Sequence, residues 1–230
     1  MLSTMQEVPF SVARILTYGQ TIHSTTRVTT WRSGEAEESS FAAIGARAAA
    51  FAHALHDDLG ITGDERVATL LYNCAEHLEV MFAVASKGAV FTPVNIQLVE
   101  DQIAYVINHS EAQVIVADPR LADKLGRVLE LCPLVTAVCF TGTEFPASLA
   151  AALPEGIDVH NYESLLDGRS TVYDWPELPE NTAAALVYST ATTGAPKGVA
   201  YSHRSIWLEA MGLRATEVSL EQAVLALGEA

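Results

Sequence analysis

Short apolar runs alternate with amphipathic segments between residues 40 and 140, and this alternation constrains the fold more than any other feature of the sequence. Apolar residues recur three or four positions apart after Ser39 and Ser40, which predicts a capped helix over residues 40–59. A short apolar run with the composition of a buried strand follows at residues 66–71. The same alternation continues, with helices expected at 75–87, 100–109 and 119–131 and strands at 89–94, 113–117 and 135–140.

This order of elements predicts an α/β fold class with a mainly parallel sheet and flanking helices, because right-handed helical crossovers join consecutive parallel strands. From residue 141 to residue 181 the pattern weakens, and prolines stand among acidic residues. A strand is expected again at 183–189, before a hydroxyl-rich loop, a short strand and a helix from about residue 205. We therefore expect a first βα subdomain at 1–145, an irregular connection at 146–182 and the start of a second subdomain at 183–230.

The charge balance argues against one class of partner. Lys and Arg number 13 against 28 Asp and Glu, and the resulting net charge of −15 opposes binding to nucleic acid. Half of the residues are apolar, which is enough to bury a substantial core. No apolar run approaches the roughly 20 residues that a transmembrane helix needs.

The cysteines and the first ten residues indicate the cellular compartment of the protein. Cys74, Cys132 and Cys139 lack metal-ligand spacing and lie in apolar stretches, which is typical of buried free thiols in a reducing compartment. The stretch from Met1 to Phe10 lacks the basic and apolar regions of a secretory signal. These features predict a cytoplasmic protein, and they are compatible with peripheral contact at a membrane surface.

The segment from Tyr188 to Gly198 carries the clearest functional signal. It places four small hydroxyl side chains, two glycines and one lysine between two expected strands. Small residues let backbone N–H groups approach phosphate oxygens, hydroxyls donate further hydrogen bonds and a cation offsets charge, so this composition predicts a polyphosphate-binding loop. It is not a Walker A loop, because no GxxxxGK[ST] pattern occurs, and an ordinary polar connection is the alternative. The expected binding residues are Ser189, Thr190, Ala191, Thr192, Thr193, Gly194, Lys197 and Gly198.

The loop resembles the hallmark of the adenylate-forming family, which includes the AMP-forming acyl-CoA synthetases. That hallmark reads [ST]-[ST]-G-T-T-G-x-P-K-G, and nine of its ten positions agree here. Ser202, His203 and Arg204 resemble the SHR that commonly follows, although His203 can also be explained as a turn residue. Upstream landmarks resemble the family in order and spacing at Gly63–Val67, Asn73, Glu76, Gly88–Val90, Pro93–Asn95, His109–Ala112 and Asp118. The resemblance covers nearly the whole chain and is strongest to fatty-acyl-CoA ligases.

The resemblance implies a ligase of fatty-acid metabolism that works in two steps. A fatty-acid carboxylate attacks the α-phosphate of ATP and releases pyrophosphate, and the thiol of coenzyme A then cleaves the acyl-adenylate. Loop hydroxyls, backbone amides and Lys197 would hold the β- and γ-phosphates, and Mg²⁺ would neutralise charge on the leaving group. Ser189 is the candidate metal contact by family position. The family's adenine, ribose and catalytic-lysine motifs do not occur in these 230 residues, so no catalytic residue is assigned.

Two departures from the family leave an alternative open. Ala191 stands where the family usually has glycine, and a Cβ atom at positive φ costs on the order of 1–2 kcal/mol. The sequence also resembles only the amino-terminal part of the family, so we expect a truncated chain that does not form acyl-CoA by itself. A separately encoded carboxy-terminal remainder would then complete the enzyme, and a second copy of the chain in a homodimer is the other expected partner. The alternative is a catalytically inactive remnant that serves as a nucleotide-binding or interaction module.

Overall fold

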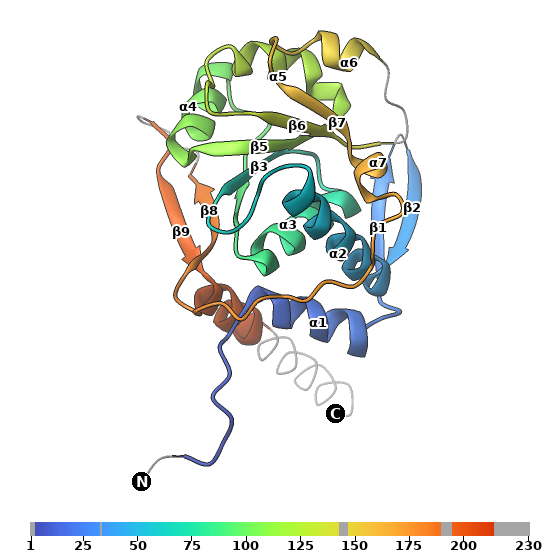
Figure 1. The fold of residues 1–230 in the computed structure, drawn as a ribbon, viewed down its shortest axis with the longest axis vertical. Coiled ribbons are helices and arrows are strands. Elements are labelled where there is room, and N and C mark those ends of the chain that lie inside the picture. Colours follow the sequence, from blue (N-terminus) through green and yellow to red (C-terminus); the bar gives the residue numbers. More distant parts are fainter. Residues whose placement is uncertain (1–2, 33, 143–146, 190–194, 214–230) are drawn as a thin grey trace, which may run out of the picture.

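A seven-stranded sheet with helices on both faces forms the body of the molecule (Figure 1). The computed structural model describes residues 3–32, 34–142, 147–189 and 195–213. The strands of this sheet are β3 (Arg66–Leu70), β4 (Val90–Pro93), β5 (Ala112–Ala117), β6 (Ala137–Phe140), β7 (Asp158–Asn161), β8 (Ala183–Tyr188) and β9 (Gly198–Ser202). The helices are α1 (Val12–Ile22), α2 (Phe41–Asp57), α3 (Ala75–Lys87), α4 (Glu100–Ser110), the 3₁₀ turn η1 (Pro119–Leu121), α5 (Ala122–Leu129), α6 (Ala147–Ala151) and α7 (Tyr162–Leu166). A further helix over 203–213 follows β9.

The sheet is parallel except at one edge. Its strands lie in the order β7-β6-β5-β3-β4-β8-β9, and only the last pair, β8 with β9, is antiparallel. The expected α/β class with a mainly parallel sheet and flanking helices is therefore confirmed.

Alternating side chains of the central strands fill two separate cores. On β5, Val114 and Val116 point into the core covered by α1, α2 and α3, whereas Ile115 and Ala117 point into the core covered by α4 and α5. All four side chains are fully buried. Burial on both faces explains why these strands read as continuous apolar runs in the sequence.

The connections reverse direction at the centre of the sheet. Helix α3 leads from β3 to β4 across one face, and α4 then leads back past β3 to β5 across the other face. In open α/β sheets, ligands bind beside the carboxyl ends of strands where such connections diverge. Because β8 is parallel to β4, the segment that follows β8 leaves the sheet at this same edge.

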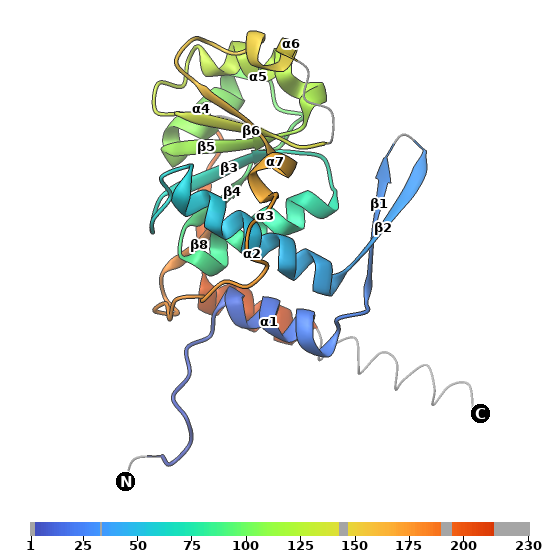
Figure 2. The same cartoon turned by 45° about the vertical axis from the view of Figure 1, so that its right-hand side comes forward.

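Several elements carried no clear signal in the sequence. Helix α1 and the antiparallel hairpin of β1 (Arg27–Arg32) and β2 (Glu35–Ser40) precede the predicted region, and the hairpin extends away from the sheet (Figure 2). Its strands are mostly exposed, so they lack an apolar alternation. Within the expected irregular connection at 146–182, the structure places α6, β7 and α7. The subdomain division at 145 and 183 stays a prediction, although β8 joins the same sheet as β4.

The cysteines follow the predicted pattern. All three are free; Cys132 and Cys139 are buried, and Cys74 is half-buried at the start of α3. Burial raises the pKa of Cys74 to about 12 and that of Cys132 to about 11, so neither thiol ionises readily. Among the helices that the structure describes, none is both long enough and apolar enough to cross a membrane.

Candidate functional site

The predicted phosphate-binding loop joins β8 to β9, so one antiparallel strand pair fixes both of its ends. The tip of the loop, residues 190–194, lies outside the described residues, and the roles predicted for it stay predictions. The structure places the other three predicted binding residues, Ser189, Lys197 and Gly198, at the two ends of the loop.

Ser189 and Lys197 form the neck of the loop. The Ser189 N–H donates to the Lys197 carbonyl oxygen at 3.0 Å, and the Lys197 N–H donates to the Ser189 Oγ at 3.4 Å. The Ser189 hydroxyl is exposed, and a serine oxygen has two lone pairs and one proton. Among the described residues no other contact to this hydroxyl occurs, so one lone pair and the proton are available there for a cation or a phosphate oxygen.

The Lys197 side chain is available for an anion. It is exposed, and in the described part of the chain no carboxylate lies within ion-pair distance of its ammonium group. Twelve ion pairs do occur among the described residues, and none of them includes this lysine. A lysine at a loop end without an acidic partner fits the recognition of phosphate as a point charge.

Gly198 leaves room for the Tyr188 ring beside the neck of the loop. It pairs with Tyr188 across the two strands, and a Cβ atom at position 198 would lie 3.1 Å from two carbons of the Tyr188 ring. The Tyr188 hydroxyl in turn lies 2.7 Å from Nδ1 of His109 at the end of α4. Burial raises the pKa of Tyr188, so this hydroxyl stays protonated. Gly198 and His109 thus fix the last residue before the loop.

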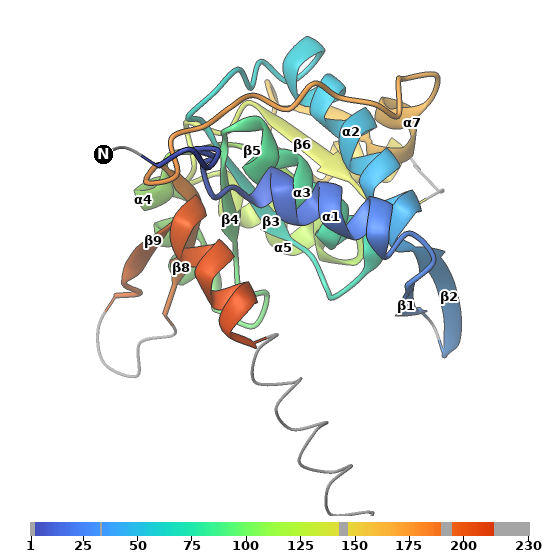
Figure 3. The same cartoon turned by 90° about the horizontal axis from the view of Figure 1, so that it is seen from below.

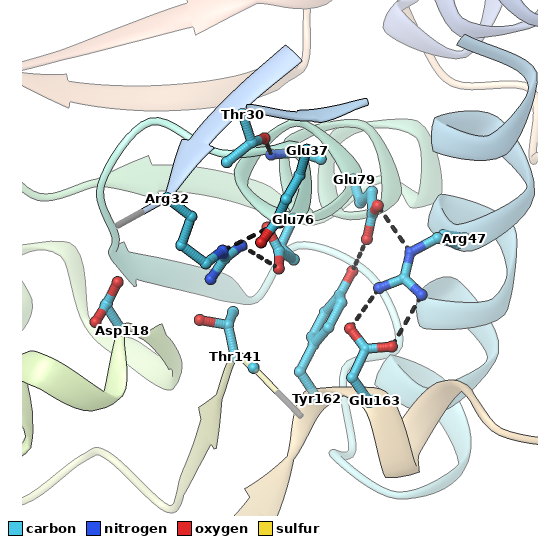
Figure 4. A network of polar contacts seen from close by, with 12 residues as sticks. Thr30, Arg32, Glu37, Arg47, Glu76, Glu79, Asp118, Thr141, Tyr162 and Glu163 are labelled. Atoms are coloured by element: carbon cyan, nitrogen blue, oxygen red, sulfur yellow. Dashed lines mark hydrogen bonds and ion pairs between the residues drawn. The ribbon is translucent and has the colours of Figure 1, made fainter. Parts of the chain in front are cut away.

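A partly buried polar network joins helices α2, α3 and α7 (Figure 4). Arg47 donates to Glu79 at 2.8 Å and to both oxygens of Glu163 at 2.6 and 2.9 Å, and the Tyr162 hydroxyl donates to Glu79 at 3.0 Å. Burial lowers the pKa of Arg47, but hydrogen bonds to the two carboxylates outweigh burial and raise it. These contacts connect α2, α3 and α7. Because each of the charged side chains named here is paired with another, we assign the network a structural role and not a catalytic one.

A second cluster of polar side chains lies at the carboxyl ends of β3 and β5. Arg32 reaches from the hairpin to Glu76 at 2.7 Å, while the other Glu76 oxygen is buried and has no hydrogen-bond partner among the described residues. Burial acts to raise the pKa of Asp118, but hydrogen bonds from Arg120 and the charge of Arg32 lower it. In the part of the chain that the structure describes, no group of three or more acidic, histidine or cysteine side chains could hold a metal ion.

The sequence profile of the AMP-binding enzyme family matches residues 20–227. The chain belongs to this family. It is 34% identical over 212 residues to the medium-chain-fatty-acid–CoA ligase of Ectopseudomonas oleovorans, and the match covers 92% of this chain and 38% of that protein. It is 31% identical over 215 residues to the 3-methylmercaptopropionyl-CoA ligase of Ruegeria pomeroyi, covering 92% of this chain and 39% of that protein. The resemblance to AMP-forming acyl-CoA ligases is therefore confirmed.

The fold agrees with solved members of the AMP-binding enzyme family. The anthranilate CoA ligase AuaEII, solved in complex with anthranoyl-AMP, superposes with a TM-score of 0.72 at 20% identity, covering 88% of this chain and 36% of that chain. This agreement confirms the adenylate-forming fold over the matched part. The chain spans about two fifths of the length of the curated relatives that it matches.

Within this AMP-binding enzyme chain, sequence reasoning found the loop but missed the side chains that hold it. Ser189, Lys197 and Gly198 lie together at the neck as predicted, and their contacts with ATP or Mg²⁺ stay predictions. Tyr188 and His109 stand 79 positions apart, so no local sequence pattern predicts that they contact each other. The aromatic residue directly before the hydroxyl-rich loop was the available clue.

Proposed function

We propose that this chain supplies the phosphate-binding part of an AMP-forming acid–CoA ligase, with a fatty acid as the acid substrate. The observation that carries the proposal is the neck of the loop, where exposed Ser189 and Lys197 lie together at the carboxyl edge of a parallel sheet. Membership of the AMP-binding enzyme family supports the reaction type.

In the proposed reaction, a carboxylate oxygen of the fatty acid attacks the α-phosphorus of ATP. The bond to the bridging oxygen of the β-phosphate breaks, pyrophosphate leaves, and the thiol of coenzyme A then displaces AMP from the acyl-adenylate. Lys197 binds the β- and γ-phosphates and offsets the charge that develops on pyrophosphate, which lowers the barrier to its departure. The Ser189 hydroxyl donates its proton to a phosphate oxygen or offers its free lone pair to a cation.

Mg²⁺ bound to the phosphates would supply further neutralisation of the leaving group. The residues present fit an ion held in this way, since Mg²⁺ commonly keeps several waters and binds through substrate phosphates and one or two protein oxygens. Ser189 is the one protein oxygen that we propose for it.

A fatty acid is the proposed substrate because one relative, 34% identical to this chain, is named a medium-chain-fatty-acid–CoA ligase. A second relative is named for 3-methylmercaptopropionate, a short thioether acid, and this acid is the competing choice. The proposed complete enzyme needs a remainder that supplies the adenine and acyl sites, either as a separate chain or as a further part of the same chain.

A hybrid enzyme tests the role proposed for the loop. Residues 1–213 of this chain would replace the corresponding region of the medium-chain ligase relative, and fatty-acid-dependent exchange of pyrophosphate into ATP would be measured. We expect exchange with fatty acids, and a Lys197→Ala hybrid that loses on the order of 10²-fold in rate.

The control is Lys124→Ala, which removes a lysine whose ammonium group instead contacts the carbonyl oxygens of Ile96 and Leu98. A folded hybrid that binds ATP but exchanges no pyrophosphate would favour the alternative of an inactive nucleotide-binding module. Exchange that Lys197→Ala leaves unchanged would contradict the role given to the loop.

A further inference from the structure

Strand β9, the outer strand of the pair that carries the loop, has few contacts of its own. Its residues from Gly198 to Tyr201 are exposed, and it lies at the edge of the sheet, where its strand neighbour is β8. Packing of β9 therefore contributes little to fixing its direction. Contacts at the base of the strand pair, where Ala183 faces Ser202, gain importance for that reason.

Glu180 joins this base to the amino-terminal segment. One oxygen of its carboxylate accepts from the Phe10 N–H at 3.0 Å, and the other forms an ion pair with the Arg204 guanidinium. The backbone of the same two residues is also joined, because the Arg204 N–H donates to the Glu180 carbonyl oxygen at 2.8 Å. A single side chain therefore bridges residues that lie 170 and 24 positions away in the sequence.

His203 makes a second, independent connection. Its side chain is fully buried, and its Nδ1 lies 3.3 Å from the Val12 N–H at the start of α1. Because a backbone N–H can only donate, Nδ1 must be unprotonated, and the proton of the neutral ring is on Nε2. The His203 N–H donates to the Thr182 carbonyl oxygen at 3.1 Å, so the same residue also contacts the residue directly before β8.

Aromatic packing completes the junction. The rings of Phe10 and Trp207 stack with centroids 4.3 Å apart, and the Arg204 guanidinium lies 5.4 Å from the centre of the Phe10 ring. Figure 3 shows the helix over 203–213 beside the chain that enters α1. We call Phe10, Val12, Glu180, His203 and Arg204 the hairpin clamp, because they lie at the base of the hairpin that β8 and β9 form, which is distinct from the hairpin of β1 and β2.

We propose that the hairpin clamp positions the phosphate-binding loop, and that Glu180 and His203 are positioning residues for nucleotide binding although neither reaches the loop. The clamp holds the base of β8 and β9 from both sides, so it sets the direction in which the neck points. The proposal rests on the proposed function only for the identity of the ligand. It assigns a role to the SHR segment that requires no contact with substrate.

Hydrogen exchange tests the positioning step without any nucleotide. In the 230-residue chain, Glu180→Gln replaces one acceptor oxygen by a donor, and we expect amides of residues 198–202 to exchange at least about fivefold faster. The matched control is Glu177→Gln, which makes the same charge change at an exposed position three residues earlier. Unchanged exchange in residues 198–202, or equal acceleration in β3 to β6, would overturn the proposal.

Nucleotide affinity tests the consequence, with Mg·ATP as the probe and thermal melting as the check on folding. We expect Glu180→Gln and Phe10→Leu to weaken Mg·ATP binding several-fold, while Glu177→Gln has no effect. If Glu180→Gln accelerates exchange but affinity is unchanged, the clamp does not position the site and the proposal fails. If the wild-type chain binds no Mg·ATP, the proposed function is contradicted, and the exchange result still decides whether the clamp orders the strand pair.

Discussion

Gly126 on α5 lies where the helix crosses the segment after α6. A Cβ atom there would come within 2.0 Å of the Ala152 carbonyl oxygen, which the backbone cannot accommodate without a shift. We expect Gly126→Ala to lower the free energy of unfolding by about 2 kcal/mol, because overpacking costs about 3 kcal/mol and the gain in helix propensity offsets about 1 kcal/mol. Urea unfolding measures this, with Gly63→Ala as the control, since open space surrounds that position. Equal stability of both variants would contradict the close approach.

Ala191 lies outside the described residues, and its role stays a prediction drawn from the sequence. Glycine tolerates positive φ and leaves more space beside a phosphate oxygen. In the hybrid ligase, we therefore expect Ala191→Gly to lower the Michaelis constant for ATP. The control is Ala195→Gly, at the position that the family hallmark leaves variable. A constant that stays the same or rises would show that the alanine is harmless.

His203 makes stability depend on pH. Burial lowers its pKa below the usual 6.5, so the unfolded chain binds more protons than the folded chain in the window between the two pKa values. The contribution of His203 to the free energy of unfolding is therefore fully present above pH 6.5 and is lost as the pH falls through the folded pKa. His77 contributes in the same direction, because burial lowers its pKa as well.

The measurement is the urea midpoint of the wild type and of His203→Asn between pH 7.5 and about 5. Asparagine keeps an acceptor for the Val12 N–H but does not titrate, so the variant should lose less stability on acidification than the wild type. The same pH dependence in both proteins would show that His203 is not the titrating group.

At the scale of elements, the sequence predicted the buried parts well and the exposed parts poorly. Helix α3 was predicted with both of its ends because an apolar face precedes Gly88, which closes the helix at φ 102°. Strands β3 to β6 are buried on both faces, so their apolar runs are unambiguous. The hairpin of β1 and β2 has no such pattern, since its stability comes from cross-strand pairs and from the Arg32–Glu76 contact, which the sequence does not encode locally.

The contrast between buried and exposed elements also predicts which amides are protected from hydrogen exchange. The region from 40 to 140 contains most of the two buried cores, whereas β9 is exposed along most of its length. We expect amides from residue 183 onward to exchange faster than those of β3, β5 and β6 in the wild-type chain. Limited proteolysis with mass spectrometry provides the second readout. Uniform protection from residue 40 to residue 213 in a monomer would contradict this order.

At the scale of the whole molecule, the candidate site was only partly predictable. The loop residues are adjacent in the sequence, so their composition alone indicated a phosphate site. The hairpin clamp joins residues 10, 12, 180, 203 and 204, and the Tyr188–His109 contact joins α4 to β8. Such contacts depend on which strands become neighbours, and that order follows from packing of the complete sheet rather than from any local pattern.

The central claim is that the loop between β8 and β9 binds the phosphates of ATP. NMR spectra of the labelled 230-residue chain, titrated separately with Mg·ATP, magnesium tripolyphosphate and AMP, test it most directly. We predict that amide signals of residues 188–202 shift with Mg·ATP and with tripolyphosphate, that AMP causes little change, and that Lys197→Ala removes the shifts. Equal shifts with AMP, or shifts confined to other parts of the chain, would contradict the claim.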